Sequence, residues 1–346
     1  MATPRTPTAR LVDDLLEGGH ERAARQVLNA MGRELETGVI NQRLTELETE
    51  AQRLEEAGER LSPDNPVYRQ LVRDMDDYLG RNQQRITDAA VALTEAGVEA
   101  SNILSQRLVV TGMPGDIVSL VNRAWNRPDP EAVASLVDFT QDSAFSTMLN
   151  RYSSSVIEAI GNRATYGFVN GWGARRSARA IRQLAVGMPR SQAETLTRTL
   201  HLVSYRRGTA ATHAANARIL QPVALRVAVL DPRTCLACVA LHGTEIPLGQ
   251  PVRDHWQGRC LAIAQVRGFN RQIVSGEDWF NSLSPQRQAE QRAFVQSPAM
   301  LAAYNDGAVT FQDFVREGSD PLFGEMVYQQ SLVGALGDDA RKYYRR

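Results

Sequence analysis

Cysteine is rare in this chain of 346 residues, and all three cysteines lie in one short window. Cys235 and Cys238 form a C-x-x-C pair, and Cys260 follows in the same stretch together with His242 and His255. A C-x-x-C pair can direct two sulfurs at one ion while backbone amides turn towards the thiolates. We therefore expect the segment around residues 235–260 to fold around a metal ion.

His255 and Cys260 supply the two remaining corners of a Cys3His tetrahedron around the C-x-x-C pair, with His242 as the alternative ligand. Zinc is the ion that three thiolates and one imidazole suit best. A closed four-coordinate site leaves no open position for a substrate. The pattern therefore predicts a structural zinc site and assigns no catalytic residue.

Three other chemistries also use a C-x-x-C pair. A disulfide between Cys235 and Cys238 would close a very short loop and leave Cys260 without a partner. A thioredoxin-like pair starts a helix in a βαβ unit, whereas here Asp231-Pro232-Arg233 follows a strand-like run. A zinc deaminase needs an H-x-E sequence upstream, and His213 is followed by two alanines. Structural metal is favoured, and disulfide, free-thiol and catalytic roles stay open.

The window resembles the D-x-x-T-C-x-x-C-x-x-L-x-G signature of the phage Mu F-like head morphogenesis family of tailed bacteriophages. The matching positions are Asp231, Thr234, Cys235, Cys238, Leu241 and Gly243. In that family a proline-containing spacer leads to H-x-x-C-R-C; here Pro251 leads to His255, and Arg259 and Cys260 match. Gly258 stands where the family has the first of those two cysteines. The fourth ligand is therefore either Cys260 or His242.

The resemblance implies a minor capsid protein, present in few copies, at the DNA-entry vertex of the phage head. Its specific part is confined to residues 231–260, and an Arg- and Ala-rich composition extends it weakly over residues 173–219. The implied partners are the portal protein and the head shell, with DNA as a further candidate. The implied location is the virion, after synthesis in the host cytoplasm.

The first third of the chain has the pattern of two long helices. Apolar residues recur every three or four positions over residues 40–61, which predicts one helix packing along another. Two prolines in Ser62–Pro66 end that helix, and a second is expected over about residues 67–108. A turn at Gly112–Gly115 then precedes a short helix that reaches Trp125.

The segment from about residue 130 to residue 220 is predicted to be helical, with breaks at Gly171–Gly173 and Gly187–Pro189. Residues 101–230 carry 15 basic and 7 acidic side chains, a net charge of +8, whereas residues 1–100 carry −7. Four arginines in this basic segment fall on one side of a predicted helix, where they would meet DNA, an acidic partner or only solvent. They are Arg175, Arg176, Arg179 and Arg182.

Strand-like sequence is confined to the surroundings of the cysteines. Val223–Leu230 is β-branched and apolar, and Thr244–Leu248 is a second candidate that Pro247 restricts to a sheet edge. After residue 270 we expect short helices and turns. The stretch from Trp279 to the end holds 10 of the 22 aromatic residues, which predicts a compact core there.

Together these patterns predict a mainly α protein with long helical hairpins, a small zinc-stabilised α+β module and a short helical C-terminal region. The predicted segments are 1–111, 112–220, 221–270 and 271–346. No transmembrane segment, signal peptide or known catalytic motif is evident in the sequence. The predicted function is binding in head assembly, with no membrane and no small-molecule substrate. The alternative is a zinc-dependent nucleic-acid enzyme such as a packaging-associated nuclease.

Overall fold

The structure, a computed structural model, describes residues 38–129, 143–170 and 172–344, with a few isolated residues outside these ranges. The chain divides into two compact units. Unit 1 comprises residues 1–19, 94–137 and 201–346, and unit 2 comprises residues 20–93 and 138–200. The protein is mainly helical with a small sheet module, as the sequence predicts. The predicted division into four segments stays a prediction.

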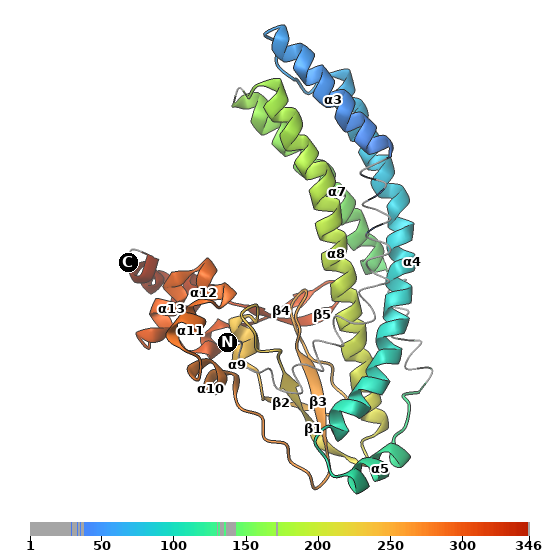
Figure 1. The fold of residues 1–346 in the computed structure, drawn as a ribbon, viewed down its shortest axis with the longest axis vertical. Coiled ribbons are helices and arrows are strands. Elements are labelled where there is room, and N and C mark those ends of the chain that lie inside the picture. Colours follow the sequence, from blue (N-terminus) through green and yellow to red (C-terminus); the bar gives the residue numbers. More distant parts are fainter. Residues whose placement is uncertain are drawn as a thin grey trace. The chain divides into compact units, whose positions relative to one another are not determined.

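Unit 2 is built from helices only within its described residues. They are α3 (Val39–Glu56), the first part of α4 (Pro66–Val110), α7 (Ser143–Val169) and the first part of α8 (Ala174–Ala215). The predicted seam on α3 is buried at Leu44 and Leu47, and Arg43 of α3 donates to Asp74 of α4 at 2.5 Å. The two helices run side by side (Figure 1), which confirms the predicted pair.

The predicted helix break at Gly187–Pro189 is wrong. Helix α8 continues through Pro189, although a proline inside a helix removes one backbone hydrogen bond and costs about 3 kcal/mol. The helix survives because its apolar side is buried on both sides of the proline, at Ile181 and at Leu200. Each such side chain contributes about 1.5–3 kcal/mol. The other predicted break is confirmed, since α7 ends at Val169 and α8 begins at Ala174.

Unit 1 contains a three-stranded antiparallel sheet in the order β2-β1-β3. Strand β1 (Leu220–Val227) is central, β2 (Glu245–Pro247) is the predicted edge strand, and β3 (Leu261–Val266) is a strand that the sequence does not indicate. Helix α5 (Gly115–Ala124) contributes Val121 to the core beside the sheet. The expected α+β character around the cysteines is therefore present, with one more strand than predicted.

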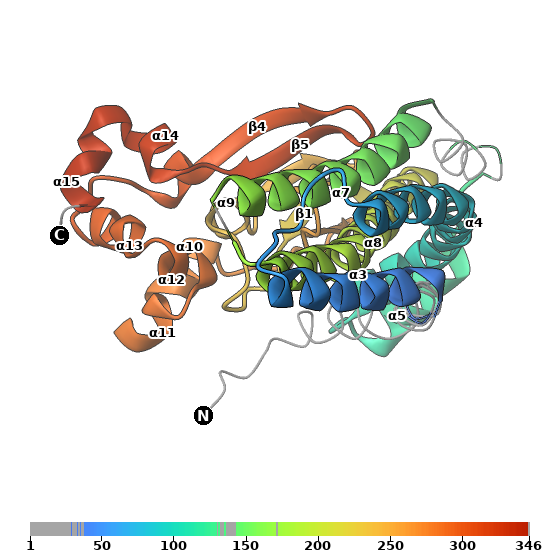
Figure 2. The ribbon, with the colours of Figure 1, turned by 90° about the horizontal axis from the view of Figure 1, so that it is seen from above.

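The C-terminal part of unit 1 is a group of short helices (Figure 2), and these helices enclose an aromatic core. Phe280 lies edge-to-face against Phe294 and Phe311 at 5.6 Å and 5.0 Å, so the predicted aromatic core is present. A hairpin of two strands, β4 and β5, was not predicted. The elements are α10 (Gly276–Asn281), α11 (Pro285–Ala289), α12 (Arg292–Gln296), α13 (Pro298–Asn305), η2 (Phe311–Phe314), β4 (Val315–Asp320), β5 (Gly324–Gln329), α14 (Leu332–Leu336), η3 (Gly337–Ala340) and α15 (Arg341–Tyr344).

Candidate metal centre

Sheet pairing brings the two halves of the cysteine window together. Strand β1 leads into the C-x-x-C pair, and the loop that carries His255 and Cys260 leads into β3. The last residue of β1, Val227, is the pairing partner of Leu261, the first residue of β3. Cys260 directly precedes Leu261, so the register of this pair places its sulfur beside the exit of β1, where the C-x-x-C pair begins.

A short turn aims the C-x-x-C pair. The Thr234 backbone amide donates to the carbonyl of Asp231, and the chain then enters helix α9 (Leu236–Ala240) with Cys235 at its N-cap. The sulfur of Cys235 accepts a hydrogen bond from the Cys238 amide at 3.3 Å. An amide turned towards a sulfur in this way is typical of C-x-x-C pairs that bind a metal. Gly243, which follows the helix, has a φ of +85°, a conformation that suits glycine.

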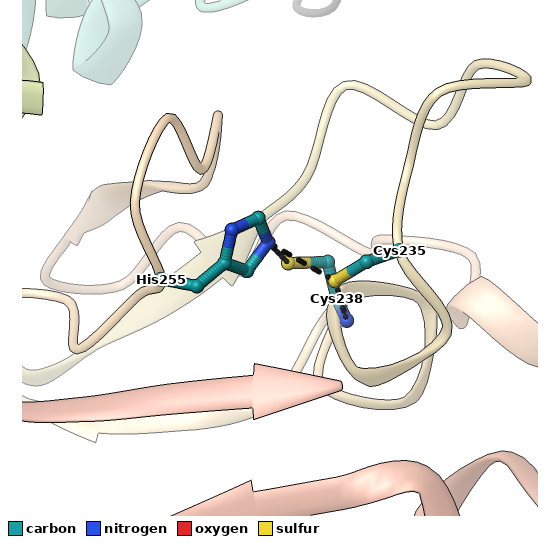
Figure 3. A group of neighbouring side chains, drawn as sticks. All are labelled: Cys235, Cys238 and His255. Atoms are coloured by element: carbon teal, nitrogen blue, oxygen red, sulfur yellow. Dashed lines mark hydrogen bonds between the residues drawn. The ribbon is translucent and has the colours of Figure 1, made fainter. Parts of the chain in front are cut away.

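Three of the four predicted ligands, Cys235, Cys238 and His255, lie close together (Figure 3). The His255 Nε2 atom is 3.2 Å from the Cys235 sulfur and 3.7 Å from the Cys238 sulfur. These three residues form one group with the spacing of a metal site, and Cys238, Asp254 and Cys260 form a second; within each group all ligand atoms lie within 4.8 Å of one another. Cys238 belongs to both groups. The four predicted ligands therefore form one cluster that can hold a metal ion.

Asp254 is the buried carboxylate of this centre, and its side chain has no exposed surface. It accepts hydrogen bonds from the Cys260 and His255 amides at 3.0 Å and 2.9 Å, and the Cys238 thiol donates to it at 3.4 Å. One side chain thus fixes the loop around His255 and Cys260 against the helix that carries Cys238. It is the kind of outer-shell group that orients metal ligands.

Two buried arginines surround Asp254. The Arg206 guanidinium donates to the Asp254 carboxylate at 2.8 Å, to the Cys260 carbonyl at 2.9 Å and to the Gly258 carbonyl. Arg226 lies 3.5 Å from the same carboxylate and 3.8 Å from the Cys238 sulfur. Their side chains are 3% and 5% exposed, so two positive charges are held inside unit 1 next to the sulfurs.

The charges of this cluster set the direction of its pKa values. Burial opposes the charged form of Asp254, but Arg206 above all, and also His255 and Arg226, outweigh it and lower the pKa of that carboxyl. Burial likewise acts against the charged Arg226, yet the charges of Cys260, Asp254 and Cys238 raise its pKa overall. The carboxylate and the Arg226 guanidinium are therefore ionised. Without a metal, hydrogen bonds between neighbouring sulfurs, burial and the charge of Asp254 raise the pKa values of the Cys238 and Cys260 thiols, and Arg226 acts against this rise at Cys260.

Asp231 and Arg259 join the two ends of the cysteine window. The Arg259 guanidinium donates to both carboxylate oxygens of Asp231, at 2.8 Å and 2.5 Å. Burial acts to raise the pKa of Asp231, but the bidentate Arg259 holds it well below its usual value. Such paired bonds fix orientation as well as distance. The segment before Cys235 is thus fastened to the residue before Cys260.

The β4–β5 hairpin braces the loop that carries His255. The Trp256 indole N–H donates to Asp320 at 3.0 Å, and its ring meets the Phe323 ring edge-to-face at 5.2 Å. Gln329 of β5 accepts a hydrogen bond from the Leu236 amide in the first turn of α9 at 2.8 Å. The hairpin therefore contacts both the histidine loop and the C-x-x-C helix, so the candidate metal centre is not independent of the C-terminal region.

The alternative ligand His242 lies outside both groups. Its Nδ1 atom accepts a hydrogen bond from the Ala228 amide at 2.9 Å, and burial lowers its pKa to about 4. The histidine is therefore neutral and holds the segment that leaves β1. At Gly258 a side chain has no room, because a Cβ atom there would collide with the Asp254 carboxylate. A cysteine at position 258 would not fit beside this aspartate.

The four predicted arginines of α8 have different partners. Arg182 forms a bidentate pair with Glu48 of α3, at 2.7 Å and 3.0 Å, and Arg175 pairs with Glu55 of α3 at 3.0 Å. Arg176 instead stacks on the Trp172 ring at 4.1 Å, and Arg179 is exposed. Two of the four arginines thus connect helices within unit 2, and the role of the four in binding DNA or a partner stays a prediction.

Three residues of the centre were not predicted from the sequence: Asp254, Arg226 and Arg206. Asp254 directly precedes the predicted ligand His255, and an acid beside a ligand is a recognisable signal for an outer-shell group. Arg226 is a lone charge within the apolar run of β1, which indicates a buried partner. Arg206 has no local signal, because it lies far along the chain on α8 and reaches the site only through the tertiary fold.

Comparisons with protein-family models, with characterised proteins and with solved structures found no match for this chain. Among the described residues, no helix combines the length and the apolar character needed to cross a membrane. The assignment of a function therefore depends on the geometry of the centre and on the resemblance at residues 231–260.

Proposed function

We propose that the chain is a minor head protein of a tailed bacteriophage, which acts by binding at the portal vertex and whose Cys235–Cys260 module is held by structural zinc. The observation that carries the proposal is that the signature residues act as one unit. Asp231 pairs with Arg259, Cys235 and Cys238 face His255, and Gly243 provides the turn after the helix. A resemblance is stronger when the matching residues contact one another in the fold than when it depends on composition alone.

Charge balance supports zinc bound by three thiolates. Zinc binding would release the thiol protons, including the one that Cys238 donates to Asp254 in the metal-free centre. A divalent ion with three thiolates and a neutral imidazole carries one negative charge, and Asp254 adds a second. Arg206 and Arg226 supply two positive charges, so the buried group as a whole is neutral. Buried charge is costly unless it is compensated in this way. The balance requires Cys260 as a thiolate, and it favours Cys260 over His242 as the fourth ligand.

The small cavity at the centre supports a structural role over the nuclease alternative. Its lining includes the four predicted ligands Cys235, Cys238, His255 and Cys260, and its volume is about 40 Å³. That volume admits roughly one or two water molecules. A nuclease must admit a phosphodiester group and a nucleophilic water at the metal. A divalent-metal-dependent cleavage assay on the purified protein separates the two functions, because the assembly protein is expected to be inactive.

Quantitative mass spectrometry of gradient-purified procapsids and virions tests the head assignment. We expect peptides of this chain in the particles, at far fewer copies than the major shell protein, together with the portal complex. Absence of the chain from both particles would overturn the assignment, and hundreds of copies would identify a shell or decoration protein instead. Elemental analysis tests the metal separately, with one zinc per chain as the expected value.

A further inference from the structure

A groove on unit 2 has features that the metal centre and the head assignment do not use. It lies between α7 and α8 and has a volume of about 490 Å³. Its apolar floor includes Ala159 and Ala180, and its rim carries Asn162, Arg163 and Tyr166. Tyr166 is 54% exposed, so part of its ring is available to a partner.

An arginine and aromatic cluster adjoins this groove at the α7–α8 connection. The guanidinium groups of Arg163 and Arg176 lie 4.9 Å and 4.1 Å from the centre of the Trp172 ring, and Tyr166 meets that ring edge-to-face at 5.5 Å. Trp172 is itself fixed, because its amide donates to the Gly167 carbonyl at 2.9 Å and its ring packs on that glycine. The ring thus holds two arginines in place while leaving their charges available.

These arginines differ from their neighbours on α8. Arg175 and Arg182 are neutralised by glutamates of α3, whereas among the described residues no carboxylate pairs with Arg163, Arg176 or Arg179. The result is a local excess of positive charge beside an exposed ring. A cationic groove with an available aromatic face is the combination that binds unpaired nucleotides, because bases stack on the ring while arginines contact the phosphates. Duplex DNA hides its base faces and cannot use the ring.

We propose that this groove binds single-stranded nucleic acid without sequence preference, with a base on Tyr166 and phosphates on Arg163 and Arg176. Binding there does not depend on the zinc centre or on the head assignment. Fluorescence anisotropy of a labelled oligothymidine with the whole protein measures it, and a duplex of the same length is the comparison. We expect tighter binding of the single strand at low salt and a steep loss of affinity as salt rises.

Surface variants distinguish stacking from charge. Tyr166→Ala should weaken binding about tenfold or more, whereas Tyr166→Phe should keep most of the affinity. Arg163→Ala with Arg176→Ala should reduce the salt slope by about 1.4, because each single-strand phosphate contact contributes about 0.7. Arg175→Ala is the matched control, since this neighbour pairs with Glu55. Circular dichroism should show that all of these variants are folded.

Cross-linking locates the contact directly. Bromodeoxyuridine strands irradiated with the protein should attach to peptides that contain Tyr166 or residues 176–183. Equal affinity for duplex and single strand, an equal loss in the Arg175→Ala control, or no binding at about 50 mM salt would each overturn the proposal. Cross-links confined to unit 1 would do the same.

Discussion

Arginine stands in two different electrostatic settings in this protein. One is the candidate metal centre, and the other is unit 2. Arg206 and Arg226 are almost completely buried beside Asp254 and the sulfurs, whereas the side chains of Arg175 and Arg182 are 46% and 30% exposed. Water screens an exposed pair, and it contributes about 0–1 kcal/mol. Breaking a buried pair leaves a charge without compensation and costs about 3–5 kcal/mol. The contrast predicts which substitutions unfold the protein and which only alter its surface.

Loss of the metal should have the largest effect. Cys238 belongs to both ligand groups, so Cys238→Ser should abolish metal binding. When the free metal concentration is 1,000 times the dissociation constant, metal binding stabilises the folded state by about 4 kcal/mol. The variant should lose that amount of stability. Thermal melting with and without a chelator measures it. The chelator should lower the stability of the original protein and leave Cys238→Ser unchanged, and full stability of the chelated protein would contradict a structural metal.

Removal of the buried carboxylate should have an effect of comparable size. Asp254→Asn leaves Arg206 and Arg226 without their buried partner and should lower the free energy of unfolding by about 3–5 kcal/mol. The matched control is Glu325→Gln, which breaks the exposed pair with Arg253 and should cost less than about 1 kcal/mol. Urea unfolding of both variants measures the difference. Equal costs would show that burial does not separate the two classes of arginine.

The centre shows which parts of a site are readable from sequence. Cys235, Cys238 and Cys260 were found because their spacing is local and because cysteine is rare here. Asp254 and Arg206 are equally central but are contributed by a loop and by a distant helix, and only tertiary contact gives them a shared role. Sequence spacing carries the identity of ligands well, whereas the groups that neutralise and orient them depend on three-dimensional packing.

The same limit explains the fold predictions. The two long helices of the first third follow from a local period of apolar residues, and α3 and α4 confirm them. Strand β3 was missed because its run of six residues is short, rich in alanine and defined by pairing with β1. The helix break predicted at Pro189 is wrong, because burial along α8 outweighs the local effect of the proline. Tertiary packing decided both cases.

Acid should destabilise the protein through His213, a histidine buried in unit 1. Burial lowers its pKa from 6.5 to about 4. The unfolded chain therefore binds a proton that the folded protein does not, and stability falls as the pH decreases from about 6.5 to about 4. The contribution is on the order of 3 kcal/mol at pH 4.

His213→Gln isolates this contribution from the general effect of acid on the metal ligands. At pH 7 the free energy of unfolding of the variant should not exceed that of the original protein. On acidification the variant should lose less stability. Chemical unfolding of both proteins between pH 7 and pH 4 gives the difference between their free energies as a function of pH. A difference that is constant across this range would exclude His213 as the group that titrates.

The smallest effect is expected at the α3–α8 pairs of unit 2. Arg182→Ala removes the bidentate contact with Glu48 and the hydrogen bond to Asn41, yet both partners are partly exposed and can be solvated. The cost should stay below about 1 kcal/mol and shrink further in high salt, since ions screen exposed charges. Thermal melting at two salt concentrations measures it. A salt-independent cost of several kcal/mol would mean that Arg182 behaves like Arg206, and the distinction between the two settings would not hold. Arg182 would then be a structural residue whose partner on α3 is as essential as Asp254 is to the metal centre.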